Sequence, residues 1–185
     1  PTFINFKNIM SQNLELRVPY GLSVHGEDEI EAVVEVLRTT TQMSKNVASF
    51  EEEVAKLFAK DYGVMVNSGS SALYVLIESL NLPKGSEVIT PALTFATTVG
   101  CLVKNDLVPH FVDVSFDTLG VCPVMLGDYL KKISLINDGV LYNKMTKNKI
   151  SALCVTNVLG HPAEMDELLN VCREYNIYLI EDAAE

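Results

Sequence analysis

The stretch Glu87-Val88-Ile89-Thr90-Pro91 predicts a short buried strand that ends at a proline. A helical pattern follows over residues 95–104, and Val108 to Val114 predict a second strand. Continuous apolar strands joined by a helix are typical of a parallel sheet, in which strands are buried on both faces. This unit therefore predicts an α/β fold, with a mostly parallel sheet and helices on both faces.

The same alternation extends toward the C-terminus, where we expect strands at 150–156 and 177–180 and a helix at 164–175 between them. The stretch Asn137 to Lys149 is polar and rich in lysine, and we interpret it as a solvated loop insertion. The sequence stops at Glu185, directly after a buried strand. An α/β domain needs a further helix or strand to cover such an edge, so we expect the chain to be truncated.

Toward the N-terminus, Gly63 to Asn67 form an apolar run that we predict to be a buried strand, and Ser68 then opens a helix. Two amphipathic helices are expected earlier, at 27–38 and at about 47–60. We therefore expect a single, incomplete domain. Its parts would be an N-terminal helical segment, 1–62, and an α/β sheet region, 63–185.

The composition limits the classes of partner. The chain has 185 residues, of which 48% are hydrophobic, and a formal net charge of −10. Such an acidic chain is not drawn to nucleic acids or anionic membranes. It also contains no apolar run of membrane-spanning length and no signal peptide, so we expect a cytoplasmic protein. The four cysteines show no C-x-x-C spacing, and we expect buried, reduced thiols and no metal site.

Three segments place polar or aromatic side chains where predicted strands end. Asn67 to Ala72 could hold a phosphate at a helix start, although an ordinary helix N-cap has the same residues. Phe95 could stack on an aromatic ring, although such a residue also suits a core. Asp182 could pair with a protonated pyridine nitrogen, and it equally suits a helix cap. Together the three match the phosphate, ring and ring nitrogen of pyridoxal 5'-phosphate (PLP).

The sequence resembles the DegT/DnrJ/StrS family of PLP-dependent sugar aminotransferases, and the resemblance runs nearly from end to end. It rests on a series of motifs in the family's order: Val18 to Gly21 with Gly26 to Ile30, Phe50 to Glu53, Ser68 to Leu73, Gly85 to Pro91, Thr94 to Thr98, Val108 to Val114, Gly160 to Asp166, and Glu181 to Glu185. The resemblance implies the large domain of the aspartate-aminotransferase fold, also called fold type I.

Carried over by position, the resemblance assigns roles to six residues. Gly69, Ser70 and Ser71 would bind the cofactor phosphate, and Phe95 would stack on the pyridine ring. Asp182 would act in catalysis by keeping the ring nitrogen protonated. Glu185 occupies the position near the ring's phenolic oxygen, where relatives often have glutamine.

The sequence also departs from the family. No lysine here matches the Schiff-base lysine, which would lie beyond Glu185, and Met43-Ser44-Lys45 replace the usual T-G-P loop. We expect an aminotransferase that moves an amino group, from glutamate, to a nucleotide-linked keto-deoxysugar in polysaccharide biosynthesis. The enzyme would be a homodimer, and the 185-residue chain alone would be inactive. A sugar 3-dehydratase of the same fold and a non-catalytic binding module are the alternatives. The sequence does not identify the sugar, the nucleotide or the aminated carbon.

Overall fold

The computed structural model describes residues 21–42 and 45–185. The motif residues Val18 to Tyr20, and Met43 and Ser44, lie outside the described residues. The chain divides into two compact units, residues 1–48 and 49–185. The candidate site lies wholly within the second unit.

Helices α2 and α3 come first along the described part of the chain. Helix α2 spans Glu27–Thr39. The backbone amide of its N-cap residue, Gly26, donates to the Glu29 carboxylate at 2.6 Å. Helix α3 spans Lys45–Leu57. Both match the expected amphipathic helices. The apolar side chains of α2, among them Ile30, Val33 and Leu37, are exposed in the described part of the chain.

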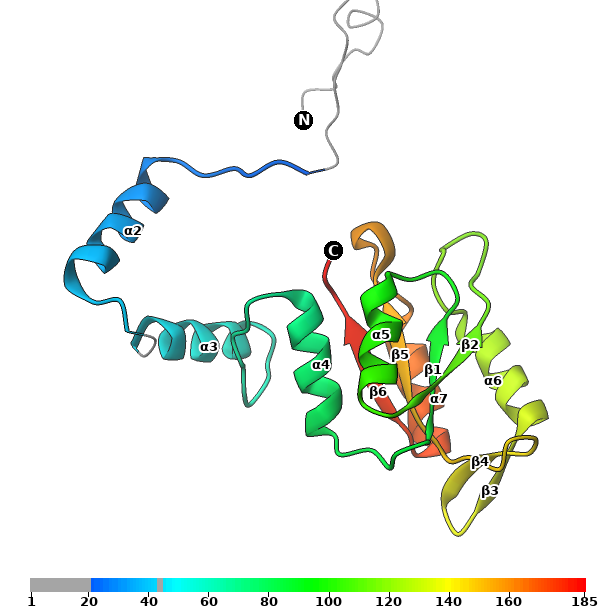
Figure 1. Ribbon diagram of the computed structural model, residues 1–185. Helices are drawn as coiled ribbons and strands as arrows, with labels where there is room; N and C mark the ends of the chain where they lie inside the picture. The colour runs from blue at the N-terminus through cyan, green and yellow to red at the C-terminus, as the bar shows by residue number, and fades with distance from the viewer. Residues whose placement is uncertain (1–20, 43–44) are drawn as a thin grey trace, which may run out of the picture. The chain divides into compact units, whose positions relative to one another are not determined.

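A four-stranded sheet forms the centre of the second unit (Figure 1). All three strand pairs are parallel, and the order is β2-β1-β5-β6. The strands are β1 (Glu87–Pro91), β2 (Val108–Val112), β5 (Ile150–Thr156) and β6 (Tyr178–Asp182). Because β1 and β5 occupy the middle, nearly all their residues are buried, which explains their continuous apolar sequence.

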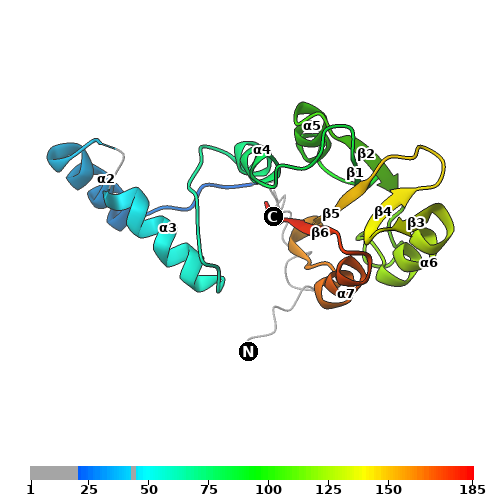
Figure 2. The same ribbon diagram turned by 90° about the horizontal axis from the view of Figure 1, so that it is seen from below.

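Helices cover both faces of this sheet (Figure 2). Helices α4 (Gly69–Ser79) and α5 (Ala96–Lys104) pack on the face that carries Val88 and Cys154. Helices α6 (Pro123–Ile133) and α7 (Met165–Tyr175) pack on the face that carries Ile89 and Leu153. Successive residues of a strand point to opposite faces, so each buried strand contributes to both cores. The predicted α/β fold is confirmed.

The interpretation of residues 137–149 as a solvated loop is wrong. Strands β3 (Ser134–Asn137) and β4 (Val140–Asn143) form an antiparallel hairpin around Asp138 and Gly139, both with positive φ. An Asp-Gly pair is the usual signal for such a two-residue turn. The polar side chains here were misleading, because Asn143 is buried and donates to Glu87 at 2.9 Å.

The predicted strand at Gly63 to Asn67 is also wrong. Strands need a neighbouring ladder, and no strand of the described residues pairs with this segment. The Met65 amide donates instead to the Glu51 carboxylate of α3 at 2.8 Å. Gly63 lies so close to α3 that a Cβ there would stand 2.6 Å from the Glu51 carbonyl oxygen. Apolar composition alone therefore did not distinguish a strand from an extended segment held by a side chain.

Candidate cofactor-binding site

The candidate residues gather at the carboxyl edge of the sheet. Strands β1, β5 and β6 are parallel, so the segments that follow them emerge on the same side. Thr94, in the segment after β1, and Thr156, the last residue of β5, illustrate this, because their hydroxyl oxygens lie 2.8 Å apart. Ligands of open α/β sheets bind at this edge.

The start of α4 presents hydrogen-bond donors. Ser68 is the N-cap, and its hydroxyl accepts from the Ser71 amide at 3.2 Å. The Ser71 hydroxyl in turn donates to the Asn67 side chain at 2.7 Å. As first residues of the helix, Gly69 and Ser70 have amides with no acceptor within it, and they carry the positive end of the helix dipole. This start suits an anion such as a phosphate.

Asp182 lies at the end of β6 and is only 6% exposed. Thr98, in α5, donates its hydroxyl to Asp182 Oδ2 at 2.7 Å, and the Ala184 amide approaches Oδ1 at 3.3 Å. A carboxylate can accept about four hydrogen bonds, so these two donors leave capacity for a ligand. The arrangement fits a carboxylate held in one orientation for a cationic or N–H partner.

Phe95 precedes α5 as its N-cap residue and is 71% exposed. Its ring is therefore not part of the core, so the alternative interpretation of Phe95 as a core residue does not hold. An exposed ring at this edge is available to stack on a planar ligand.

Short contacts connect the helix starts to the end of β6. A Cβ atom at Gly69 would lie 3.9 Å from the Ala184 Cβ, so the start of α4 adjoins the segment after β6. The Cys101 thiol donates to the Ser70 carbonyl at 3.4 Å and joins α5 to α4. Together with the Thr98–Asp182 bond, these contacts bring the phosphate-binding and ring-nitrogen candidates to one place.

Glu185 contacts the loop after β5. Its carboxylate accepts from the Leu159 amide at 2.7 Å, and a Cβ at Gly160 would lie 3.3 Å from the Glu185 carbonyl oxygen. Leu159 and Gly160 both have positive φ, at 56° and 75°, which makes this a sharp turn. The expected contact of Glu185 with the ring's phenolic oxygen therefore stays a prediction.

Three supporting residues were missed by the sequence reasoning. Thr98 belongs to the quoted Thr94 to Thr98 motif, in which only Phe95 received a role. Asn157 ties the end of β5 to β6, because its amide donates to the Asp182 carbonyl at 3.0 Å and its side chain to the Glu181 carboxylate at 2.9 Å. Thr156 completes the hydroxyl pair with Thr94. Thr156 and Asn157 share one signal, a position at or just past the end of β5, whereas Thr98 lies in the first turn of α5.

Buried thiols lie beneath this edge. Burial raises the pKa of Cys154 to about 12, and the nearby charges of Asp182 and Cys101 add to the effect. Burial also raises the pKa of Cys101, against the opposing charge of Lys104. These thiols stay protonated at neutral pH and act as small apolar side chains, as the sequence predicted.

The geometry defines a class of protein. An anion-binding helix start, an exposed ring and a buried carboxylate with spare capacity lie together at one sheet edge, and these groups fit PLP. Within residues 21–42 and 45–185, no group of histidine, cysteine and acidic side chains could hold a metal ion. In the same described ranges, no helix is long and apolar enough to cross a membrane. These groups together suit a phosphorylated, planar ligand.

The chain belongs to the DegT/DnrJ/EryC1/StrS aminotransferase family, whose sequence model matches residues 24–185. A 3-dehydratase for dTDP-4-dehydro-2,6-dideoxy-D-glucose from Saccharopolyspora spinosa is 31% identical over 172 residues, covering 89% of this chain and 34% of the relative. GDP-perosamine synthase from Escherichia coli O157:H7 is 29% identical over 168 residues, covering 90% of this chain and 42% of the relative.

A solved structure supports the same assignment. GDP-4-keto-6-deoxymannose-3-dehydratase, crystallised with a trapped PLP-glutamate geminal diamine, superposes with a TM-score of 0.75 at 29% identity. The match covers 90% of this chain and 41% of that one. The predicted fold type I architecture is thereby confirmed. The chain spans about two fifths of the length of the relatives that it matches.

Proposed function

We propose that this chain provides most of the PLP-binding site of a nucleotide-sugar aminotransferase. The observation that carries the proposal is the buried Asp182, fixed by Thr98 at 2.7 Å and placed next to the anion-binding start of α4. Charge at this depth is retained where a partner compensates it. The ring nitrogen of PLP is such a partner, and the family relationship supplies the same cofactor.

Each residue of the site has a separate task. The amides of Gly69 and Ser70 and the Ser70 hydroxyl bind the cofactor phosphate, and Ser71 joins them when its hydroxyl turns from Asn67 to the phosphate. Phe95 covers one face of the ring and excludes water from it. Asp182 holds a proton on the ring nitrogen, and Thr98 fixes the carboxylate in the orientation that this requires. When bound, PLP supplies an electron sink for carbanion chemistry at the substrate.

The remaining features concern the full-length protein. We propose glutamate as amino donor, a nucleotide-linked keto-deoxysugar as acceptor, and a role in polysaccharide biosynthesis. We further propose a cytoplasmic homodimer in which the Schiff-base lysine lies outside this chain. The isolated 185-residue chain is then inactive, because it lacks the covalent anchor and proton carrier.

A sugar 3-dehydratase is the second candidate. Two of the three relatives described above are named 3-dehydratases, and their similarity equals or exceeds that of the synthase. Both candidates use the same cofactor site, so Asp182, Phe95 and the start of α4 do not distinguish them.

Cofactor titration tests the site. PLP binding to the full-length protein is followed by the absorbance of the bound cofactor, for the native sequence and for Asp182→Asn and Phe95→Ala. We expect each variant to bind PLP at least about tenfold more weakly, the size of effect of losing one charge-assisted or stacking contact. Asp106→Asn, which alters an exposed carboxylate paired with Lys84, is the matched control. Unchanged affinity in both site variants contradicts the assigned site.

Product analysis separates the two reactions. The full-length protein is incubated with PLP, ¹⁵N-glutamate and GDP-4-keto-6-deoxymannose, and the sugar nucleotide is examined by mass spectrometry. A transaminase places ¹⁵N on the sugar, whereas a 3-dehydratase removes the 3-hydroxyl as water. Loss of the hydroxyl without label in the sugar rejects the aminotransferase in favour of the second candidate.

A further inference from the structure

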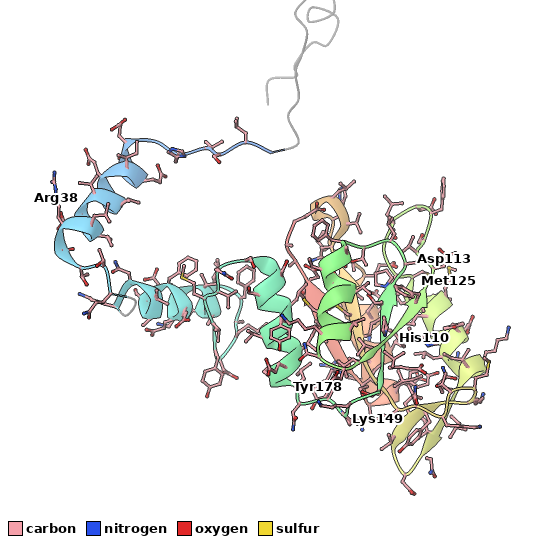
Figure 3. The ribbon with its side chains drawn as sticks, in the orientation of Figure 1. Arg38, His110, Asp113, Met125, Lys149 and Tyr178 are labelled. Carbon is pink, nitrogen blue, oxygen red and sulfur yellow. The ribbon has the colours of Figure 1, made fainter. Side chains whose placement is uncertain are left out.

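A cavity lies between strand β2 and helix α6, and none of its lining residues belongs to the proposed PLP site. Its volume is about 260 Å³, which is large enough for a single substituted aromatic ring. In Figure 3, Asp113, Met125 and His110 all lie on this β2 and α6 side of the sheet. Neither the fold nor the PLP chemistry requires a cavity here.

The walls of this cavity are apolar and rich in polarisable groups. Met125 and Leu126 contribute a thioether and an aliphatic side chain from α6, and the aromatic Tyr129 lines the cavity one turn further along this helix. Met125 is more than half exposed, although it is large and apolar. Aromatic faces and thioethers are favourable neighbours for a cation with an apolar body.

Asp113 is the one charged residue that lines the cavity. Its Oδ1 accepts from the Val114 amide at 2.9 Å. Among residues 21–42 and 45–185, no lysine, arginine or histidine forms an ion pair with it. An exposed carboxylate beside apolar walls offers a hydrogen-bond acceptor and a negative charge to a ligand.

The second polar group at the cavity is the Tyr129 hydroxyl, and a chain of hydrogen bonds orients it. Glu87 is buried and accepts hydrogen bonds from the side chains of Asn143 and Thr146. Nδ1 of His110 lies 2.9 Å from the same carboxylate, which can only accept, so Nδ1 carries a proton and Nε2 is the ring nitrogen left for another partner.

Tyr129 OH lies 2.9 Å from this Nε2. Whichever of the two atoms donates, the phenolic oxygen keeps at least one lone pair for another donor. Both Tyr129 and Asp113 therefore offer acceptors at the cavity.

We infer that the cavity between β2 and α6 binds a small organic cation with a planar, apolar body, such as an arylamidinium or arylammonium ion. The ligand's N–H groups would donate to Asp113 and to the Tyr129 oxygen, and its ring would lie against Met125 and Leu126. Anionic ligands are excluded by the Asp113 charge, and neutral ones lose the charge-assisted contact.

Benzamidinium is the probe, and neutral benzamide, of almost the same shape, is the matched ligand control. The full-length protein is labelled with ¹³C-methyl methionine, and the Met125 signal is assigned with Met125→Leu. We expect benzamidinium to shift the Met125 signal in a saturable way and benzamide to bind at least about tenfold more weakly.

Asp113→Asn tests the anchor, since asparagine keeps an Oδ1 acceptor for the Val114 amide and removes only the charge. We expect it to weaken benzamidinium binding about tenfold or more. Asp128→Asn, on the solvent side of α6 and paired with Lys131, is expected to change nothing. Equal binding of benzamide and benzamidinium, an unmoved Met125 signal, or undiminished binding by Asp113→Asn overturns the inference.

Discussion

Two buried carboxylates occupy opposite edges of the same sheet, and they differ in how many donors surround them. Glu87, at the amino end of β1, is 1% exposed and receives hydrogen bonds from His110, Asn143 and Thr146. Asp182, at the carboxyl end of β6, is 6% exposed and receives one side-chain bond, from Thr98, and a longer backbone bond from Ala184.

The difference fits a structural role for Glu87 and the ligand-binding role that we propose for Asp182. The partners of Glu87 come from β2 and from the chain around the β3–β4 hairpin, so its carboxylate joins segments and has little capacity left. Asp182 is equally buried and keeps lone pairs toward the site. Depth alone does not identify a functional carboxylate; the number of unused acceptor positions does.

The largest expected effect on stability is that of removing the Glu87 carboxylate. Glu87→Ala removes the acceptor of three side chains and leaves their polar groups buried, so we expect a loss of about 3–5 kcal/mol in the free energy of unfolding. Urea denaturation measures it, with the exposed Glu78→Ala as control. A loss below about 1 kcal/mol would show that Glu87 does not hold the hairpin.

Alkaline pH tests the cysteine thiols that are buried in the core between the two ends of the sheet. Burial raises the pKa of Cys154 and of Cys172 to about 12 in the folded protein, from the ordinary value of 9.0. The unfolded chain therefore releases these protons first. Stability is complete below about pH 9 and falls as pH rises toward 12, by about 1 kcal/mol per pH unit for each thiol.

Cys154→Ala isolates one of these contributions. We expect the variant to lose stability less steeply than the native protein between pH 9 and pH 11, when unfolding is measured by denaturant at a series of pH values. Identical slopes would mean that the Cys154 thiol does not stay protonated in the folded state.

Asp182→Asn should affect the free energy of unfolding less than it affects the binding of PLP. Asparagine keeps an oxygen that accepts from Thr98, so we expect the free energy of unfolding without PLP to change by about 1 kcal/mol or less. Saturating PLP should raise the melting temperature of the native protein more than that of the variant. An equal rise in both proteins would place the cofactor elsewhere.

The smallest effect on stability is expected for Phe95→Ala. The ring is 71% exposed, so its removal should alter the free energy of unfolding by less than about 0.5 kcal/mol. Phe116→Ala, at an even more exposed ring outside the site, is the control. A large loss of stability for Phe95→Ala alone would return this ring to a structural role.

Much of the fold could be predicted from local pattern. The apolar runs at 87–90 and 150–156 became the central strands, and Ser68 became the N-cap of α4, as expected. Helix α6 and the hairpin were missed. The helix signal, Pro123 at its start, stood in a stretch to which we assigned no element, and the turn signal, Asp138-Gly139, stood in the stretch that we interpreted as a loop. The Gly63 to Asn67 run failed for the opposite reason, because a strand depends on a neighbour that its own sequence does not specify.

The sequence by itself determined the alternation of strands and helices at 87–112 and 150–182, the family and the residue types at each strand end, because these follow from periodicity and short motifs. Only the tertiary structure decided which polar residues meet. Thr98 and Asp182 are 84 positions apart, and Asn143 and Glu87 are 56 apart. The number of hydrogen bonds that a buried carboxylate accepts depends on such distant donors. Folding of the sheet and its connections brings these donors close to the carboxylates.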